Sequence, residues 1–491
     1  MKLNTDKMKR IVFAMMAFAT LTFVSCSDDD GGPDTTETCS DGIQNNGETG
    51  IDCGGPNCTA CEDSTEDPTC NDGIQNGDET GIDCGGSCEA CAESNEVTVS
   101  DNVTEDTTWT ADNMYFLDGR IFVEPGATLT IEAGTIIKGN PGTGANASVL
   151  VIPAGANIEA VGTAEAPIIF TSSTDDIAIG QTSGSNLDEN NRGEWGGLIV
   201  LGNAPVSLDG DAPQAQIEGL PTEDNNFGLY GGEDPADDSG TLKYISIRHG
   251  GALIGEGNEI NGLTLGGVGS GTEVDHIEVV ANVDDGVEFF GGTVNATNLF
   301  VWAQGDDAID IDQAYSGTID NVVIVQGGVS DHALEIDGPE GSLEGRFTLT
   351  NVTMFGNDAA EDGEYADYRS NAMGMTSNVY AVGFPAGKDV ELDNNAVAQN
   401  FLDWDADRTM AVGLAFDAWE IEGFGNEIFV ESVAKDDNDV EIENPIILDP
   451  TFTERAADWA TMIEAGATAS VGADVSAFAW TYANVKASLG F

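Results

Sequence analysis

The stretch IDNVVIVQ (residues 319–326) decides the fold, because its pattern returns along the chain. Similar stretches start at residues 242 (LKYISIRH), 274 (VDHIEVVA), 297 (TNLFVWAQ) and 349 (LTNVTMFG), so that successive copies are 32, 23, 22 and 30 residues apart. Side chains two residues apart on a strand lie on the same face of a sheet. Two apolar columns are therefore predicted to face the interior, namely Ile245, Ile277, Phe300, Val322 and Val352, and Ile247, Val279, Trp302, Ile324 and Met354.

A repeat near 22 residues with unequal insertions is typical of a right-handed parallel β-helix, in which each coil adds one strand to each stacked sheet. Residues 127–137, 148–158 and 197–202 fit as earlier coils. We therefore predict an all-β fold with a parallel β-helix over residues 98–380. A β-propeller is the structural alternative, but its blades repeat at about 40 residues or more.

The repeat fades in residues 381–491, which we expect to form further coils and a partly helical C-terminal cap. Residues 453–465 are predicted to form one amphipathic helix with Ala456, Trp459, Met462 and Ile463 on one face. A cap would cover the strand edges and core that an open coil end exposes. With the phrases RGEWGGLIV (192–200) and VGA (471–473), the region resembles the β-helix lipoproteins of marine and gliding bacteria, a resemblance that implies no particular activity.

The N-terminus has the features of a secretory signal over residues 1–25: four basic residues, an apolar run from Ile11 to Val24, and Ser25 before Cys26. The run is too short to span a bilayer. It resembles a bacterial lipoprotein signal, which implies acylation of Cys26, and the acidic tether at residues 26–38 resembles the export tag of Bacteroidetes-type lipoproteins. We expect a lipid-anchored outer-membrane protein exposed at the cell surface. An ordinary cleaved signal is the alternative.

The other eight cysteines form two copies of one small unit, at residues 39–61 and 70–91. Units this small bury little core, and outside the inner membrane their cysteines are expected to pair. We predict two disulfides per unit, with connectivity open, among Cys39, Cys53, Cys58, Cys61, Cys70, Cys84, Cys88 and Cys91. Zinc is the competing interpretation, because a CxxC motif closes each unit. The units resemble Cys-rich stalk repeats near the tether of bacterial surface proteins.

The charge of the chain excludes some classes of partner. It has 87 acidic and 16 basic residues, a formal net charge of −71. Such a field repels nucleic acid, so no nucleic-acid partner is expected. No motif indicates a nucleotide or redox cofactor. Divalent cations such as calcium are natural counter-ions, although adaptation to high salt explains the composition equally well.

Three acidic segments, DDGVEFF (284–290), DDAIDID (306–312) and DHALEID (331–337), fall on successive coils. Alternation predicts that Glu288, Asp310 and Glu335 face outward. Coils stack about 4.8 Å apart, where each like-charge contact costs about 1 kcal/mol even in water. Calcium, protonation, or solvation with salt screening would each offset this cost. The possible calcium ligands are Asp284, Glu288, Asp306, Asp310, Asp312, Asp331, Glu335 and Asp337.

The same segments suggest an enzymatic alternative. NVDDG (282–286), GDD (305–307) and His332 resemble, in order, the NTDG, GDD and GHG motifs of polygalacturonase-type β-helix hydrolases. The resemblance implies that Asp285, Asp306 and Asp307 serve as general acid and water-activating base, with His332 beside them. However, Asp331 and Ala333 stand where that family has glycines, no Arg-x-Lys motif follows, and alternation directs Asp285, Asp307 and His332 toward the core.

The sequence thus favours a non-catalytic surface lipoprotein for adhesion or glycan binding, assisted by calcium, whose partner is a polysaccharide or another cell-surface component. A polysaccharide-degrading hydrolase or lyase of the β-helix type is the alternative, since a fold by itself does not establish an activity.

Overall fold

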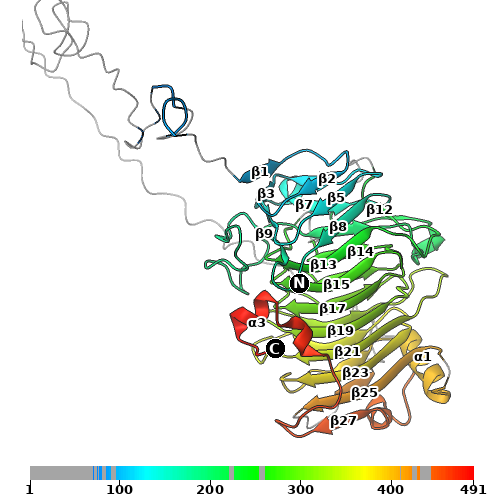
Figure 1. The fold of residues 1–491 in the computed structure, drawn as a ribbon. Helices are drawn as coiled ribbons and strands as arrows, with labels where there is room; N and C mark the ends of the chain where they lie inside the picture. Colours follow the sequence, from blue (N-terminus) through cyan, green and yellow to red (C-terminus); the bar gives the residue numbers. More distant parts are fainter. Residues whose placement is uncertain are drawn as a thin grey trace, which may run out of the picture. The chain divides into compact units, whose positions relative to one another are not determined.

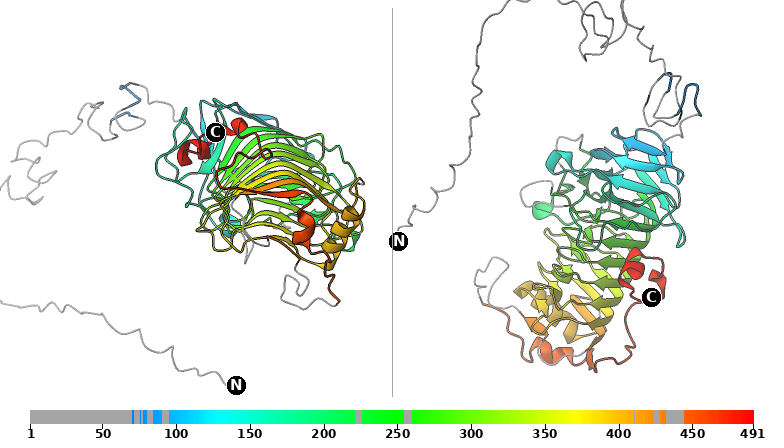
Figure 2. Two further views of the ribbon diagram at one scale, coloured as in Figure 1. Left: turned by 90° about the horizontal axis from the view of Figure 1, so that it is seen from below. Right: turned by 90° about the vertical axis from the view of Figure 1, so that its left-hand side faces the viewer.

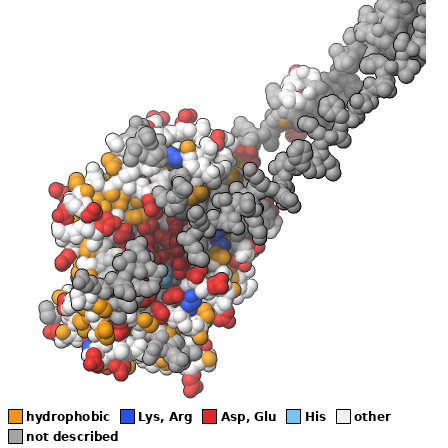
Figure 3. Space-filling view, turned by 180° about the vertical axis from the view of Figure 1, so that it is seen from behind, with side chains coloured by type: hydrophobic (Ala, Val, Ile, Leu, Met, Phe, Trp, Pro, Cys, Tyr) orange, Lys and Arg blue, Asp and Glu red, His pale blue; other side chains and the backbone are white. Residues whose placement is uncertain are grey.

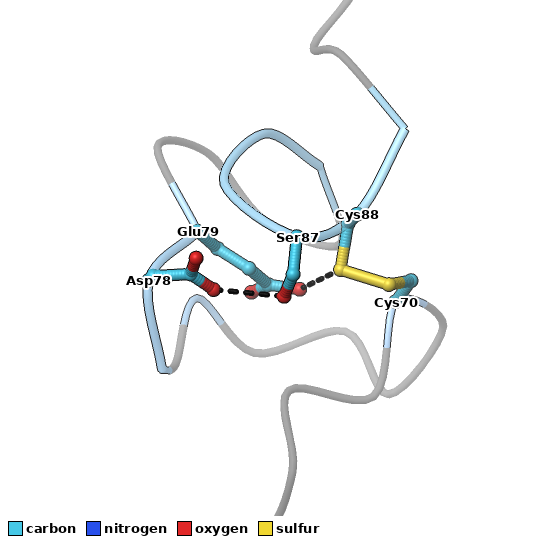
Figure 4. The surroundings of a disulfide bond; sticks show 5 residues. All are labelled: Cys70, Asp78, Glu79, Ser87 and Cys88. Atoms are coloured by element: carbon cyan, nitrogen blue, oxygen red, sulfur yellow. Dashed lines mark hydrogen bonds between the residues drawn. A yellow bond between two sulfur atoms is a disulfide. The ribbon is translucent and has the colours of Figure 1, made fainter.

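The computed structural model describes residues 70, 75, 77–79, 84–89, 95–220, 226–253, 260–409, 411–422, 428–431 and 444–491. The chain divides into two units, residues 1–93 and 94–491. Within the first, a disulfide joins Cys70 to Cys88, and the Ser87 hydroxyl donates to the carboxylate of Asp78 at 2.9 Å (Figure 4). Cys84 is also disulfide-bonded. The remaining cysteines of the prediction lie outside the described residues, namely Cys26, Cys39, Cys53, Cys58, Cys61 and Cys91.

Residues 94–491 form the predicted parallel β-helix, a stack of coils seen from three directions in Figures 1 and 2. One ten-stranded parallel sheet contains, in order, β4 (Arg120–Phe122), β7 (Val149–Ile152), β10 (Leu198–Leu201), β14 (Leu263–Gly266), β16 (Val287–Phe290), β18 (Ile309–Asp312), β20 (His332–Ile336), β22 (Glu364–Tyr368), β24 (Val390–Leu392) and β26 (Phe429–Glu431).

A second, fifteen-stranded parallel sheet wraps the rest of each coil. Its first strands are β1 (Glu96–Val99), β2 (Thr107–Trp109), β3 (Met114–Leu117), β5 (Thr128–Ile131), β6 (Ile136–Gly139), β8 (Asn157–Val161) and β9 (Ile168–Ser172). The later ones are β13 (Gly240–Arg248), β15 (Glu273–Val280), β17 (Asn295–Trp302), β19 (Thr318–Val325), β21 (Phe347–Phe355), β23 (Gly374–Val382), β25 (Leu414–Glu422) and β27 (Ala460–Ile463).

The smaller elements are α1 (Asn395–Ala406), α2 (Phe452–Ala456), α3 (Tyr482–Ala487), the 3₁₀ turns η1 (Gly144–Asn146), η2 (Asp209–Asp211) and η3 (Val475–Phe478), and the antiparallel pair β11 (Ala215–Gln216) and β12 (Leu229–Tyr230). Among the described residues, no helix has the length and apolar character needed to cross a bilayer.

The predicted interior columns are correct in four of the five coils and wrong by one residue in β17. Ile277 pairs with Leu299 and not with Phe300, which instead lies opposite Glu278. Leu299 and Val301 therefore occupy the core positions, whereas Phe300 and Trp302 lie on the outer face. The error arose because four apolar residues in succession, LFVW (299–302), satisfy either frame.

A row of asparagines sets the true register. Asn298, Asn321, Asn351 and Asn378 each adopt the left-handed conformation, with φ between 55° and 64°, in the middle of a long strand. Asparagine tolerates this conformation better than most residues. The side-chain amide of Asn321 donates to the side-chain oxygen of Asn298 at 2.7 Å, and the side-chain amide of Asn378 donates to the side-chain oxygen of Asn351 at 3.0 Å. The row bends these four coils at the same place.

The C-terminal segment covers the outer face of the long sheet. Phe300 and Trp302 pack with Phe478 and Tyr482, and α3 lies across the middle strands in Figure 1. Beneath it, the fully buried Glu278 carboxylate accepts the backbone N–H groups of Tyr482 at 3.1 Å and of Ala483 at 2.8 Å. Glu278 thereby satisfies donors that the first turn of a helix leaves free.

The predicted single helix over residues 453–465 is wrong. Helix α2 ends at Ala456, and β27 continues the chain as an extended strand paired with β25. The backbone hydrogen bonds of an open sheet edge thus outweigh the helical periodicity of the sequence. Trp459 is still buried, but Met462 is 43% exposed.

A long insertion between β10 and β13 covers part of the outer face of the ten-stranded sheet. Val206, Leu208 and Tyr230 of this insertion pack on outward-facing apolar residues that include Leu201 and Phe290. Beside the insertion, the outward positions of β16, β18 and β20 carry Glu288, Asp310 and Glu335, which places the candidate site.

Candidate functional site

An acidic cleft of about 480 Å³ lies on the outer side of β16, β18 and β20. In Figure 3, acidic side chains gather in the middle of this face of the molecule. We define the acidic cleft by its lining residues, Glu218, Asp284, Asp285, Glu288, Asp306, Asp307, Asp310, Asp331, His332, Glu335 and Arg369. The cleft therefore unites nine carboxylates with one histidine and one arginine.

Strand register builds the floor of the cleft. Glu288 pairs with Asp310, and Asp310 with Glu335. Their neighbours along each strand, such as Ile309 and Ile311, are buried in the interior cluster. The predicted alternation is therefore confirmed for these strands, and it aims one carboxylate of each coil outward.

Asp285, Asp307 and His332 were expected to face the core, and this expectation is wrong. All three line the acidic cleft. The reason is that Ala308 and Ile309, like Ala333 and Leu334, are both buried in the interior cluster although they are consecutive. A small inward-facing residue at the corner of each coil interrupts the period of two and turns the preceding side chain outward.

The structure brings all four residues of the enzymatic alternative together, Asp285, Asp306, Asp307 and His332. Of the eight predicted calcium ligands, six line the cleft, namely Asp284, Glu288, Asp306, Asp310, Asp331 and Glu335. The other two follow at the ends of their strands: Asp312 lies opposite Phe290 in the register, and Asp337 forms an ion pair with Arg369 at 2.8 Å.

Sequence reasoning missed four residues. Asp367 and Glu391 continue the outward row on β22 and β24. The segment EYADY (364–368) has the same alternation as HALEI (332–336), so Asp367 could have been found by extending the alignment by one coil. Arg369 follows on the same coil, whereas Glu218 comes from the insertion between β10 and β13 and has no sequence signal that points to the cleft.

A chain of short contacts links successive coils inside the cleft. The Asp285 carboxylate accepts the backbone N–H of Asp307 at 3.0 Å. The Asp307 carboxylate accepts the backbone N–H of His332 at 2.7 Å and lies 2.9 Å from the His332 Nδ1 atom. Burial alone would lower the pKa of His332, but the hydrogen bond and charge of Asp307 outweigh it and raise this pKa to about 10. His332 is therefore a cation at neutral pH.

Several carboxylates of the cleft resist ionisation. Burial, followed by the charges of neighbouring carboxylates, raises the pKa of Asp285, Glu288 and Asp310 well above the ordinary value. The same causes raise the pKa of Asp306 to about 6 and that of Glu335 to about 10. Without added counter-charge, the cleft therefore retains protons that free carboxylic acids would lose.

Three carboxylates could hold a metal ion. One oxygen from each of Asp285, Glu288 and Asp310 lies within 4.8 Å of the others. Asp310 is 9% exposed, and its Oδ1 atom has no hydrogen-bond partner among the described residues. Within the described residues, no arginine, lysine or histidine side chain forms an ion pair with any of the three. An all-oxygen set of this kind suits a hard divalent cation such as calcium.

Comparison with known proteins supports the fold. A family model described as the pectate-lyase-like β-helix domain matches residues 101–445. Among solved structures, the pectin methylesterase from Aspergillus niger is similar at 13% sequence identity, over 68% of this chain and 87% of that chain, with a TM-score of 0.27. Similarity at this level carries no argument about the site. No curated protein matches the chain.

Proposed function

The chain belongs to the family of pectate-lyase-like β-helix domains, and from this premise we propose that it binds glycans in the acidic cleft with the help of divalent cations. The proposal includes display at the cell surface, with a lipid on Cys26 and the two Cys-rich units as a stalk. The anchor and stalk rest on the sequence features of residues 1–91.

The observation that carries the proposal is that the Oδ1 atom of Asp310 lies beside two other buried carboxylates and has no hydrogen-bond partner in the part of the chain that the structure describes. A buried polar atom without a partner costs about 1–3 kcal/mol, more if charged. A calcium ion held by Asp285, Glu288 and Asp310 would remove that cost and neutralise the set. Because a bound calcium ion also takes oxygen ligands from outside the protein, it would offer a contact for sugar hydroxyl or carboxylate groups.

The charge of the protein makes the cation necessary for acidic glycans. A net charge of −71 repels polyanions unless a cation bridges the two. Neutral glycans carry no such requirement and could contact the cleft carboxylates through their hydroxyl donors. Calcium dependence should therefore be strongest for acidic polysaccharides.

Polysaccharide cleavage is the second candidate function, and the Asp306, Asp307 and His332 group favours it. The pKa of Asp306, about 6, falls in the range that suits a general acid near neutral pH. Asp306 would protonate the glycosidic oxygen of the leaving sugar, while Asp307 would activate water; Asp285, whose pKa burial raises well above the ordinary value, would stay protonated. Against this, Asp307 is already engaged by the backbone and the ring of His332.

One experiment separates the two functions. The mature chain is incubated with neutral and acidic polysaccharides, with calcium or with chelator, and retention on the polymer is measured together with the release of new reducing ends. We expect calcium-dependent retention without cleavage, reduced at least tenfold by Asp310→Asn and unchanged by Asp101→Asn, which alters an exposed carboxylate. The proposal is refuted if neither the chelator nor Asp310→Asn reduces retention on the polysaccharide. Cleavage of a polysaccharide that is lost in Asp306→Asn would establish the second function.

A further inference from the structure

A second cavity lies away from the acidic cleft, on the outer side of the C-terminal coils. Its volume is about 460 Å³, which is within the range of small-molecule sites. We call it the arginine pocket. Its walls come from the starts of β21, β23 and β25, from the end of α1 and from the segment before β27, and the residues used below are Arg346, Met375, Trp404, Arg408, Asp417 and Trp459.

Arg346 brings a positive charge to this pocket without a matching anion. Its guanidinium donates to the carbonyl oxygen of Gly413, and to that of Gly374 at 3.3 Å. Within the described residues, no carboxylate oxygen lies within 4.0 Å of it. In a chain with 87 acidic and 16 basic residues, an arginine bonded only to neutral carbonyls retains its capacity for an anion.

Arg408 has a different role, because its charge is already balanced. It pairs with Asp405, and with Asp458 at 3.2 Å, and its guanidinium lies 5.1 Å from the ring centre of Trp404. These contacts fix one wall of the arginine pocket. Arg346 is therefore the residue that selects for negative charge.

The remaining walls combine apolar surface with groups that can hydrogen-bond. Trp404, Trp459 and Met375 line the pocket. The indole N–H of Trp459 is buried and has no acceptor among the described residues. Asp417 is exposed at the rim and offers only acceptor atoms, which suits hydroxyl donors.

We propose that the arginine pocket is a binding site for a small ring compound that carries one carboxylate and at least one hydroxyl group. The carboxylate pairs with Arg346, the ring packs against the tryptophan and methionine surface, and a hydroxyl donates to Asp417. Sugar acids and hydroxyaromatic acids share this chemistry. Binding here needs no divalent cation, so it is independent of the function proposed for the acidic cleft.

The test is titration calorimetry on the full mature chain in chelator, with glucuronate and 4-hydroxybenzoate as probes. Glucose and 4-hydroxybenzyl alcohol are the matched uncharged controls. We expect saturable one-site binding of at least one acid, and binding at least tenfold weaker for its uncharged partner. The acid that binds shows whether the ligand is a sugar acid or a hydroxyaromatic acid. If neither acid binds, the proposal is overturned.

Variants locate the site. Arg346→Gln should weaken acid binding at least tenfold, whereas Arg120→Gln, which removes another arginine that donates to a backbone carbonyl, should leave it within twofold. Met375→Trp fills the pocket without changing its charge and should also abolish binding, which keeps the test open if Arg346→Gln does not fold. Unchanged binding in a folded Arg346→Gln or Met375→Trp variant would overturn the proposal.

Discussion

Replacing Asp312 by asparagine should stabilise the protein at neutral and alkaline pH, in the absence of divalent cations. Burial, followed by the charge of Asp337, raises the pKa of Asp312 from 3.8 to about 7. Because the folded-state pKa lies above the unfolded value, the native protein binds more protons than the unfolded chain between these two pH values. Stability therefore falls as the pH rises from 3.8 to about 7. Asparagine removes the ionisation and retains an acceptor for the Gln313 backbone N–H, which Asp312 accepts at 2.6 Å.

The magnitude follows from the pKa. A shift of about three units, at about 1.4 kcal/mol per unit, gives an upper bound of about 4 kcal/mol above pH 7. With solvent screening we expect about 2–4 kcal/mol. Unfolding entropy of about 2.1 cal/mol/K per residue over about 400 residues converts this gain into a rise in Tm of about 2–5 °C.

The assay is thermal and urea unfolding followed by circular dichroism, in chelator, at several pH values from about 4 to about 8. The gain from Asp312→Asn should be near zero at about pH 4 and complete at about pH 8. Asp101→Asn, at an exposed position, should change the free energy of unfolding by less than about 0.5 kcal/mol throughout. A gain that is independent of pH, or a loss at about pH 8, would refute the electrostatic account.

Three further predictions concern other parts of the molecule. The chain has three histidines, so NMR of the imidazole protons can follow each one. His332 should titrate at about 10, and His249, whose pKa is lowered chiefly by burial, at about 4. If His332 instead titrates near 6.5, its hydrogen bond to Asp307 is absent. Glu278→Gln should lower the free energy of unfolding by about 3 kcal/mol, because it leaves the buried Arg248 guanidinium, 4.0 Å away, without its anion. Limited proteolysis should then release the C-terminal segment. The control is Glu273→Gln, which changes a side chain that is 57% exposed. Asn351→Ala should destabilise the protein more than Asn351→Gly by about 1 kcal/mol in urea unfolding, because glycine adopts a φ of 58° with less strain than alanine. Equal losses of stability in the two variants would mean that the bend does not constrain this residue.

The sequence predicted the fold and much of the cleft because both follow from strand periodicity. The outward direction of three side chains, those of Glu288, Asp310 and Glu335, follows from alternation within single strands, because the backbone of a strand fixes which positions face inward and which face outward. The errors lie where alternation stops. Asp285 precedes its strand, and the LFVW run of β17 is apolar at every position, so neither the period nor hydrophobicity determines the direction of these side chains.

Contacts between distant segments were beyond the reach of such reasoning. Glu218 reaches the cleft from an insertion, and Tyr482 covers Glu278 from 204 residues away in the sequence. The sequence did not point to Arg346, because its significance depends on the fact that no carboxylate oxygen of the described residues lies within 4.0 Å of it.

The internal cations of the cleft indicate where an external one would bind. Arg369 pairs with Glu335 and Asp337, and protonated His332 lies against Asp307. The later coils of the stack therefore carry their own counter-charges. The Asp285, Glu288 and Asp310 set has none among the described residues, although its carboxylates are as closely spaced. This distribution of cations along the row of acids favours a site that is completed by an ion from solution at Asp285, Glu288 and Asp310, which form no ion pair with a cation among the described residues.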